Sequence, residues 1–254
     1  MDANNSRKIK SDETLISILN HLQVTEDSRV SDIAEALDIA PSTAHGHLAT
    51  LEAHGLITKT DMEYQLGLKF LDYGEHARRQ HPLYEVTKET IEELANQTRE
   101  KVWVIVEENG EAVYLNGASG EKSVKTYARE GQHTGLHHLA AGKAILSELP
   151  PERVKEIIET HGLTEKTEHT ITNTSILFDE LEEIRKRGVA FNIEESVLGL
   201  HAIGAPINDE NGDVMGAISV SAPANRVTRE KMESSLMEEL KGTVNELEIT
   251  LRYI

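Results

Sequence analysis

The sequence contains no cysteine. This absence excludes a disulfide scaffold, a thiol nucleophile and a metal site with cysteine ligands, and it fits a reducing cytoplasm. The sequence also lacks a run of about 18 apolar residues, and no charged-then-apolar leader precedes the first helical pattern. We therefore expect a cytoplasmic protein that has no membrane partner.

Basic residues are scarce relative to acidic ones. The chain has 26 Lys and Arg against 44 Asp and Glu, which gives a formal net charge of −18, and residues 1–80 hold eight basic and thirteen acidic side chains. Non-specific DNA affinity comes mostly from Lys and Arg that release phosphate counterions. Two interpretations follow: a DNA-binding protein of a salt-rich cytoplasm, where phosphate attraction is screened, or a protein that binds no nucleic acid.

Two short helical patterns stand close together within residues 30–55. In the second pattern, Ala44, Leu48 and Leu51 recur at helical spacing after Pro41, which suits a first helical turn. The opposite face has short polar side chains and no acid until Glu52, and its candidate DNA-binding residues are Ser42, Thr43, His45, His47 and Thr50. Such a face can hydrogen-bond to base edges in a major groove. An ordinary helical hairpin with a solvated face is the alternative.

The segments around this helix pair complete a recognisable plan. A third apolar helical stripe precedes it at residues 15–22, and two short strands follow at residues 56–60 and 64–66. Three helices and a small hairpin form a winged helix-turn-helix, in which the hairpin can lie against the DNA backbone. Lys59 is then a candidate phosphate contact, although a surface lysine without a partner is an equal alternative.

Residues 82–254 switch to a mixed α/β pattern. Strands are predicted at residues 102–106, 111–115, 123–129, 189–194, 201–207 and 214–221, between helices that include 139–149 and one long terminal helix from residue 226. In the last strand, alternation places Ser219 and Ser221 on one face. Two hydroxyls among apolar walls would suit a small carboxylate or carbonyl compound, whereas serines that face solvent are the alternative.

Neighbouring segments add candidates to this effector site. Leu200 and Ala202 share a face of the adjacent predicted strand, as do Asn192 and Glu194 in the strand before it. The helix that starts near Ala141 and Gly142 could aim backbone N–H groups at an anion.

Four segments, in order, resemble the IclR family of transcription regulators over nearly the whole chain. They are APSTAHGHLATLEAHGLI, then Tyr64-x-Leu66-Gly67 with Leu71 and Gly74, then GQHTGLHHLAAGKAIL, and finally IRKRGVAFNIEESVLGLHAIGAPINDENGDVMGAISVSAP with Arg226 and Thr228.

The resemblance implies an α+β fold, with a winged helix-turn-helix domain at residues 1–66, a linker helix at 67–82 and a GAF-like effector-binding domain at 83–254. It also implies a regulator, not an enzyme, that needs no cofactor. Such regulators bind a palindromic operator in double-stranded DNA as a homodimer or a dimer of dimers, modulated by a small organic effector.

The resemblance places the family's effector residues at the positions chosen above, with departures. Asn192 stands where some members have an acid, Ala202 stands where a cysteine is frequent, and Gly46 stands where many members have an arginine. Arginine is the usual bidentate reader of guanine. The ligand and the mode of base reading therefore differ from the common pattern.

A histidine-dependent enzyme or metal sensor is the rival interpretation. His133, His137 and His138 are clustered, and three more potential ligands lie further along the chain, namely Glu194, Glu195 and His201. Their spacing matches no hydrolase motif of the H-E-x-x-H type. The sequence also has no G-x-S-x-G elbow, Walker loop or dinucleotide fingerprint, so we expect no catalytic residues and no metal.

Overall fold

The computed structural model describes residues 8–25 and 27–253. The chain divides into two compact units after Ala77, and each unit is described by itself. The division falls within helix α4 (Lys69–Gln80), which lies inside the predicted linker at 67–82. The outer ends of the predicted domains, at residues 1–7 and 254, lie outside the described residues.

The first unit consists of three helices and a two-stranded hairpin. The elements are α1 (Lys10–Thr25), α2 (Val30–Ala36), α3 (Pro41–Ala53), β1 (Ile57–Thr60) and β2 (Glu63–Leu66). The strands pair antiparallel, with Lys59 opposite Tyr64. One core holds the apolar stripes together, and its fully covered members include Ile18, Leu22, Ile33, Leu48 and Ile57. This arrangement confirms the predicted winged helix-turn-helix.

A six-stranded antiparallel sheet organises the second unit, in the order β5-β4-β3-β8-β7-β6. Its strands are β3 (Lys101–Glu108), β4 (Glu111–Ser119), β5 (His133–Thr134), β6 (Ala190–Ile193), β7 (Leu200–Asn208) and β8 (Val214–Pro223). Helices cover both faces of the sheet, so the central strand β3 is apolar on both sides.

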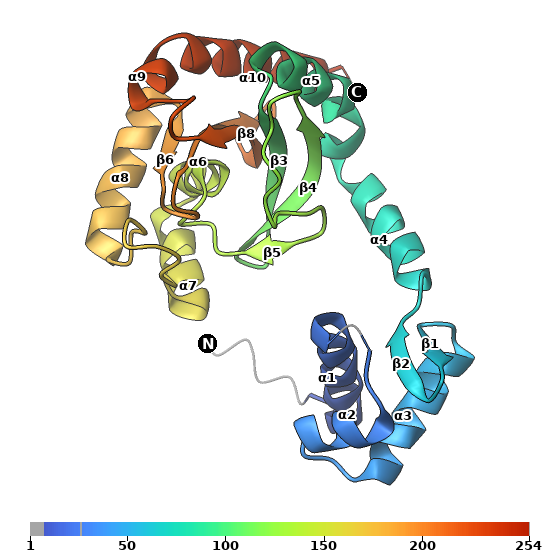
Figure 1. Cartoon of the computed structure of the whole chain (residues 1–254). Coiled ribbons are helices and arrows are strands. Elements are labelled where there is room, and N and C mark those ends of the chain that lie inside the picture. The colour runs from blue at the N-terminus through green and yellow to red at the C-terminus, as the bar shows by residue number, and fades with distance from the viewer. Residues whose placement is uncertain (1–7, 26, 254) are drawn as a thin grey trace. The chain divides into compact units, whose positions relative to one another are not determined.

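The two faces of the sheet carry separate cores, and Figure 1 shows the helices arranged around the sheet. One face packs against α5 (Pro82–Thr98), the π-helical turn at Met232–Leu236 and α10 (Met237–Leu251), and the short, exposed α9 (Arg229–Lys231) precedes that turn. The other packs against α6 (Ala140–Glu148), α7 (Pro151–His161) and α8 (Thr174–Arg187). The helices of the second unit therefore form two layers with the sheet between them, and this mixture of helices with an antiparallel sheet agrees with the predicted α+β class.

Two predicted elements differ from the structure. Residues 123–129 form no strand, and among the described strands only the short β5 pairs with the outer edge of β4, at Ala112 and Val113. The long terminal helix is interrupted at Ser234, where φ is −114° and ψ is −109°. Within the described residues, no helix combines the length and apolar character that a membrane span needs.

Candidate functional site

Helix α3 presents its predicted polar face on the surface of the first unit. Ser42, Thr43, His45 and Thr50 are exposed and His47 is half-buried, whereas the apolar positions of the same helix are covered. The Thr50 hydroxyl donates to the Gly46 carbonyl at 3.0 Å, so it remains available only as an acceptor. All five predicted α3 residues therefore share one accessible face.

Two further residues of this unit are exposed. Lys59 is exposed on β1, with its ammonium 5.0 Å from the centre of the Tyr64 ring. Gly46 is exposed too, and a Cβ built on it would meet no atom within 4 Å. No packing reason for glycine exists at that position.

The second unit contains a cavity of about 680 Å³ on the α6 face of the sheet. Strand alternation brings Ser219 and Ser221 to its wall, while Ile218 and Val220 point into the core of the opposite face. Six of the predicted effector residues line the cavity, namely Ala141, Asn192, Leu200, Ala202, Ser219 and Ser221. Four elements, α6, β6, β7 and β8, thus contribute predicted residues to one cavity.

The N-terminus of α6 forms part of the cavity wall. The first backbone hydrogen bond of the helix is donated by Lys143 N to Leu139 O at 2.9 Å. No side chain caps the helix at Leu139. Backbone N–H groups in the first turn have no partner within a helix. Gly204 on β7 allows this close approach, because a Cβ there would lie 2.6 Å from Ala141 N.

Gly142 and Glu194 do not line the cavity. A Cβ on Gly142 would lie 2.1 Å from the Leu136 carbonyl, so this glycine serves the packing of the preceding turn. Glu194 follows the end of β6 with a φ of 63°, and strand alternation no longer applies to it. Its carboxylate lies instead 3.8 Å from Nε2 of His169 and 4.0 Å from Nε2 of His201.

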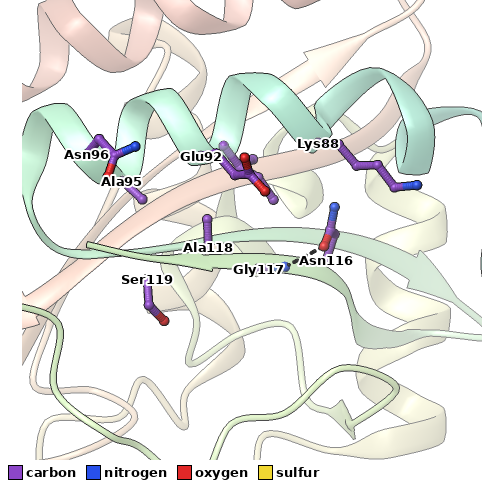
Figure 2. A pocket seen from close by; sticks show the side chains of 9 residues that line it. Lys88, Glu92, Ala95, Asn96, Asn116, Gly117, Ala118 and Ser119 are labelled. Atoms are coloured by element: carbon purple, nitrogen blue, oxygen red, sulfur yellow. Dashed lines mark hydrogen bonds between the residues drawn. The ribbon is translucent and has the colours of Figure 1, made fainter. Parts of the chain in front are cut away.

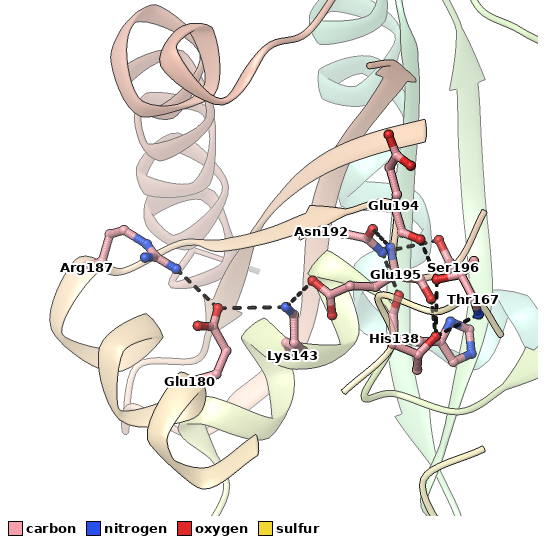
Figure 3. Close-up of polar contacts among 10 residues, drawn as sticks. His138, Lys143, Thr167, Glu180, Arg187, Asn192, Glu194, Glu195 and Ser196 are labelled. Atoms are coloured by element: carbon pink, nitrogen blue, oxygen red, sulfur yellow. Dashed lines mark hydrogen bonds and ion pairs between the residues drawn. The ribbon is translucent and has the colours of Figure 1, made fainter. Parts of the chain in front are cut away.

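The side-chain amide of Asn192 forms hydrogen bonds to other residues of the protein. Its Nδ2 donates to the His138 carbonyl at 2.6 Å and to Ser196 Oγ at 3.2 Å, and its Oδ1 accepts from Glu195 N at 2.9 Å (Figure 3). Asn192 therefore joins β6 to the segment before α6 and holds the cavity wall in place.

Comparison with protein families identifies the chain. The description "Bacterial transcriptional regulator IclR C-terminal" matches residues 75–249, and the "IclR helix-turn-helix domain" matches residues 15–61. The chain belongs to the IclR family. It is accordingly a DNA-binding transcription regulator and not an enzyme.

Relatives of this regulator match over almost its full length. "Probable HTH-type transcriptional regulator ArcR" of Halobacterium salinarum is 32% identical and covers 98% of this chain and 97% of its own. The crystal structure of the Thermotoga maritima IclR is 33% identical in sequence and has a TM-score of 0.75. The match covers 95% of this chain and 97% of that one. An IclR homolog from Microbacterium hydrocarbonoxydans, solved in complex with 4-hydroxybenzoate, shares the fold at 22% identity and a TM-score of 0.80. The match covers 96% of this chain and 100% of that one.

The three clustered histidines of this regulator take different partners. His133 lies 3.6 Å from Glu111, His137 contacts the Thr164 carbonyl at 3.0 Å, and His138 contacts Thr134 Oγ1 at 2.9 Å. Across residues 8–25 and 27–253, no group of three or more potential ligands converges for a metal ion. The family assignment does not favour the enzyme alternative either.

A buried ion pair behind the cavity was not predicted from the sequence. Lys143 on α6 is 1% exposed, and its Nζ lies 2.6 Å from Glu195 Oε1 and 3.7 Å from Glu180 Oε1 (Figure 3). Burial raises the pKa of Glu195, and Lys143 opposes that rise. The available signal was a lysine inside the otherwise apolar run AAGKAIL.

Aromatic wall residues also went unpredicted, because apolar strand patterns do not distinguish core from cavity wall. Trp103 on β3 and Tyr114 on β4 line the cavity and meet edge to face, with ring centres 4.9 Å apart. Burial raises the pKa of Tyr114 to about 12, so its phenol stays protonated at neutral pH.

A second hollow of about 540 Å³ lies between α5 and β4 (Figure 2). The polar groups that line it are the basic Lys88, the acidic Glu92, two asparagine amides and one serine hydroxyl. Lys88 is already paired with Glu85 at 2.8 Å. Since no set of like-charged groups converges there, we assign this hollow no ligand.

Proposed function

We propose that this regulator reads operator DNA through the exposed face of α3 and is modulated by a small carboxylate-bearing effector in the cavity of its second unit. The reading residues are Ser42, Thr43, His45, His47 and Thr50, with Lys59 at a phosphate. Hydroxyls and imidazoles can hydrogen-bond to base edges, and the short side chains beside them can contact a thymine methyl group. The polar surface of α3, which carries no acid before Glu52, supports this role despite the net charge of −18.

One observation supports the effector site above the others: the uncapped N-terminus of α6 opens on the same cavity as Ser219 and Ser221. Backbone N–H groups at a helix start, together with hydroxyl donors, favour a carboxylate. The same fold in Microbacterium hydrocarbonoxydans was solved with 4-hydroxybenzoate, which has a carboxylate. Asn192, Leu200 and Ala202 then shape the wall around the ligand.

A two-fold assembly on a palindromic operator completes the proposal. One α3 reaches few base pairs, and a second copy doubles the contacts at matching half-sites. Two leucines beside and within α4 support pairing between copies, because Leu68 is 86% and Leu71 is 71% exposed. Analytical ultracentrifugation of wild type and Leu71→Glu, with and without operator DNA, tests it. Equal masses for the two proteins would contradict a contact at α4.

The DNA-reading face is tested by Thr43→Glu and His47→Glu. A carboxylate placed on α3 repels phosphates and bonds poorly to most base edges, so specific affinity should fall at least about 10-fold. Gel shifts on the DNA upstream of the protein's own gene measure this. Asn20→Glu on α1 adds the same charge to the same unit as a control. Unchanged affinity in both α3 variants would reject this face.

The effector site is tested by Ser219→Leu. Ser219 is 5% exposed, and a leucine there fills cavity space and removes one donor. Thermal shift against 4-hydroxybenzoate and a panel of small acids should show a rise in melting temperature for wild type only, since a ligand stabilises the state that binds it. DNA affinity without ligand should stay the same. An equal ligand response in the variant would locate the effector elsewhere.

A further inference from the structure

The charges around the cavity contrast with those of the whole chain. The protein has 44 Asp and Glu, yet no carboxylate side chain lines the cavity among the residues that the structure describes. Two lysines do, Lys125 and Lys166. His138 adds no charge at neutral pH, because burial lowers the pKa of its imidazole to about 3. The cavity therefore has a positive lining within an acidic protein.

The two cavity lysines form no ion pair with a carboxylate of the described residues, unlike three other lysines of this unit. Lys143 pairs with Glu195, and Lys186 pairs with Glu182 and Glu183. Lys125 and Lys166 have no carboxylate partner within residues 8–25 and 27–253. Unpaired cations at a concave site concentrate anions there, even on a protein of opposite net charge.

The lysines and the α6 terminus occupy different depths of the cavity. Ser219 and Ala141 are buried, at 5% and 1% exposure, so they belong to its floor. Lys125 and Lys166 are exposed residues of two separate loops, so they belong to its rim. The aromatic pair of Trp103 and Tyr114 forms an apolar part of the wall, and Trp103 lies directly beside Ser219 in the sheet.

We propose that the effector is a dianion, with one carboxylate on the floor and a second anionic group at Lys125 and Lys166. The inference rests on the proposed effector site and deepens it. The α6 N–H groups and the serines satisfy one carboxylate, which leaves the two rim cations to recognise another. An apolar spacer in contact with Trp103 and Tyr114 joins the two groups. The cavity of about 680 Å³ holds such a molecule.

Matched acids separate this proposal from simple carboxylate binding. Dicarboxylates from succinate to suberate are each compared with the monocarboxylate of equal chain length, and terephthalate with 4-methylbenzoate. Calorimetry measures affinity. The sole tryptophan of the chain, Trp103, lines the cavity, so its fluorescence reports whether an aliphatic acid binds there.

The protein variants are Lys125→Gln, Lys166→Gln, the double variant and the control Lys155→Gln, an exposed lysine of α7. We expect at least one diacid to bind wild type more tightly than its monoacid. Each single rim variant should lose about 2- to 5-fold in diacid affinity, as exposed ion pairs do, and the double variant about 5- to 20-fold. Monoacid affinity should change less than 2-fold, and the control should match wild type.

Each contrary result has its own meaning. If monoacids bind as tightly as their diacids, or if the double variant weakens both classes equally or neither, the dianion proposal is overturned while the effector site stands. If no acid binds wild type, both the effector site and the dianion are rejected.

Discussion

The imidazole of His138 lies in the cavity wall with 3% of its surface exposed. Burial is the largest cause of its lowered pKa, and the charges of His137 and Lys166 add to the effect. A folded-state pKa of about 3, against 6.5 in the unfolded chain, means that only the unfolded chain takes up the proton between these values. His138 therefore lowers the free energy of unfolding as the pH falls below 6.5, and this loss is absent above pH 6.5.

Replacing His138 by glutamine removes that proton linkage. Between pH 7 and pH 5, wild type should lose about 1–2 kcal/mol more unfolding free energy than His138→Gln, at about 1.4 kcal/mol per pH unit below 6.5. Urea unfolding at a series of pH values measures the difference. Parallel pH curves for the two proteins would show that His138 becomes protonated in the folded state.

Single residues also mark the limit of periodic arguments. Alternation predicted the sides of Ser219 and Ser221 because both lie within β8. The same argument did not hold for Glu194, because the strand ends at Ile193 and the backbone turns to a positive φ. Alternation is a property of extended backbone, and sequence alone places the end of a strand poorly.

At the scale of elements, the contact between α6 and β7 decides the shape of the effector site. Gly204 lies under the start of α6, and a Cβ there would come within 2.6 Å of Ala141 N and 2.7 Å of Ala140 C. These are backbone atoms, so a longer side chain cannot be relieved by a rotamer change. The whole helix start has to move.

Gly204→Ala should therefore destabilise the second unit by about 1–3 kcal/mol, the usual effect of overpacking, and weaken acid binding through the displaced N–H groups. Gly242→Ala in α10 is the matched control, since a Cβ there meets nothing within 4 Å. That change should stabilise the helix by up to about 1 kcal/mol. Chemical denaturation and calorimetry of both variants test the contrast, and a Gly204→Ala protein as stable as wild type would contradict the tight contact.

At the scale of the whole molecule, the net charge of −18 acts against compactness. Like charges on a folded surface repel each other, and added salt screens them within about 10 Å at 0.1 M and 3 Å at 1 M. The ion pairs that the structure places at the surface are worth little and do not offset this repulsion.

If the acidic surface suits a salt-rich cytoplasm, the melting temperature should rise between low and molar KCl. A gain of 1 kcal/mol corresponds to roughly 2–4 °C for a chain of this size. Circular dichroism melts across a KCl series measure the rise, and a sucrose series controls for effects that do not depend on charge. Identical melting temperatures at all KCl concentrations would reject the interpretation.

Local spacing in the sequence by itself determined the elements and their faces. The stripe of Ala44, Leu48 and Leu51 set which side of α3 is exposed, and two-residue alternation set which side of β8 lines the cavity, because both follow from backbone geometry within one segment. Only the tertiary structure decided what meets across segments. Lys143 pairs with Glu195, and Lys125 lines the same cavity as Lys166. Both arrangements join parts of the chain that are distant in sequence, so no local periodicity predicts them.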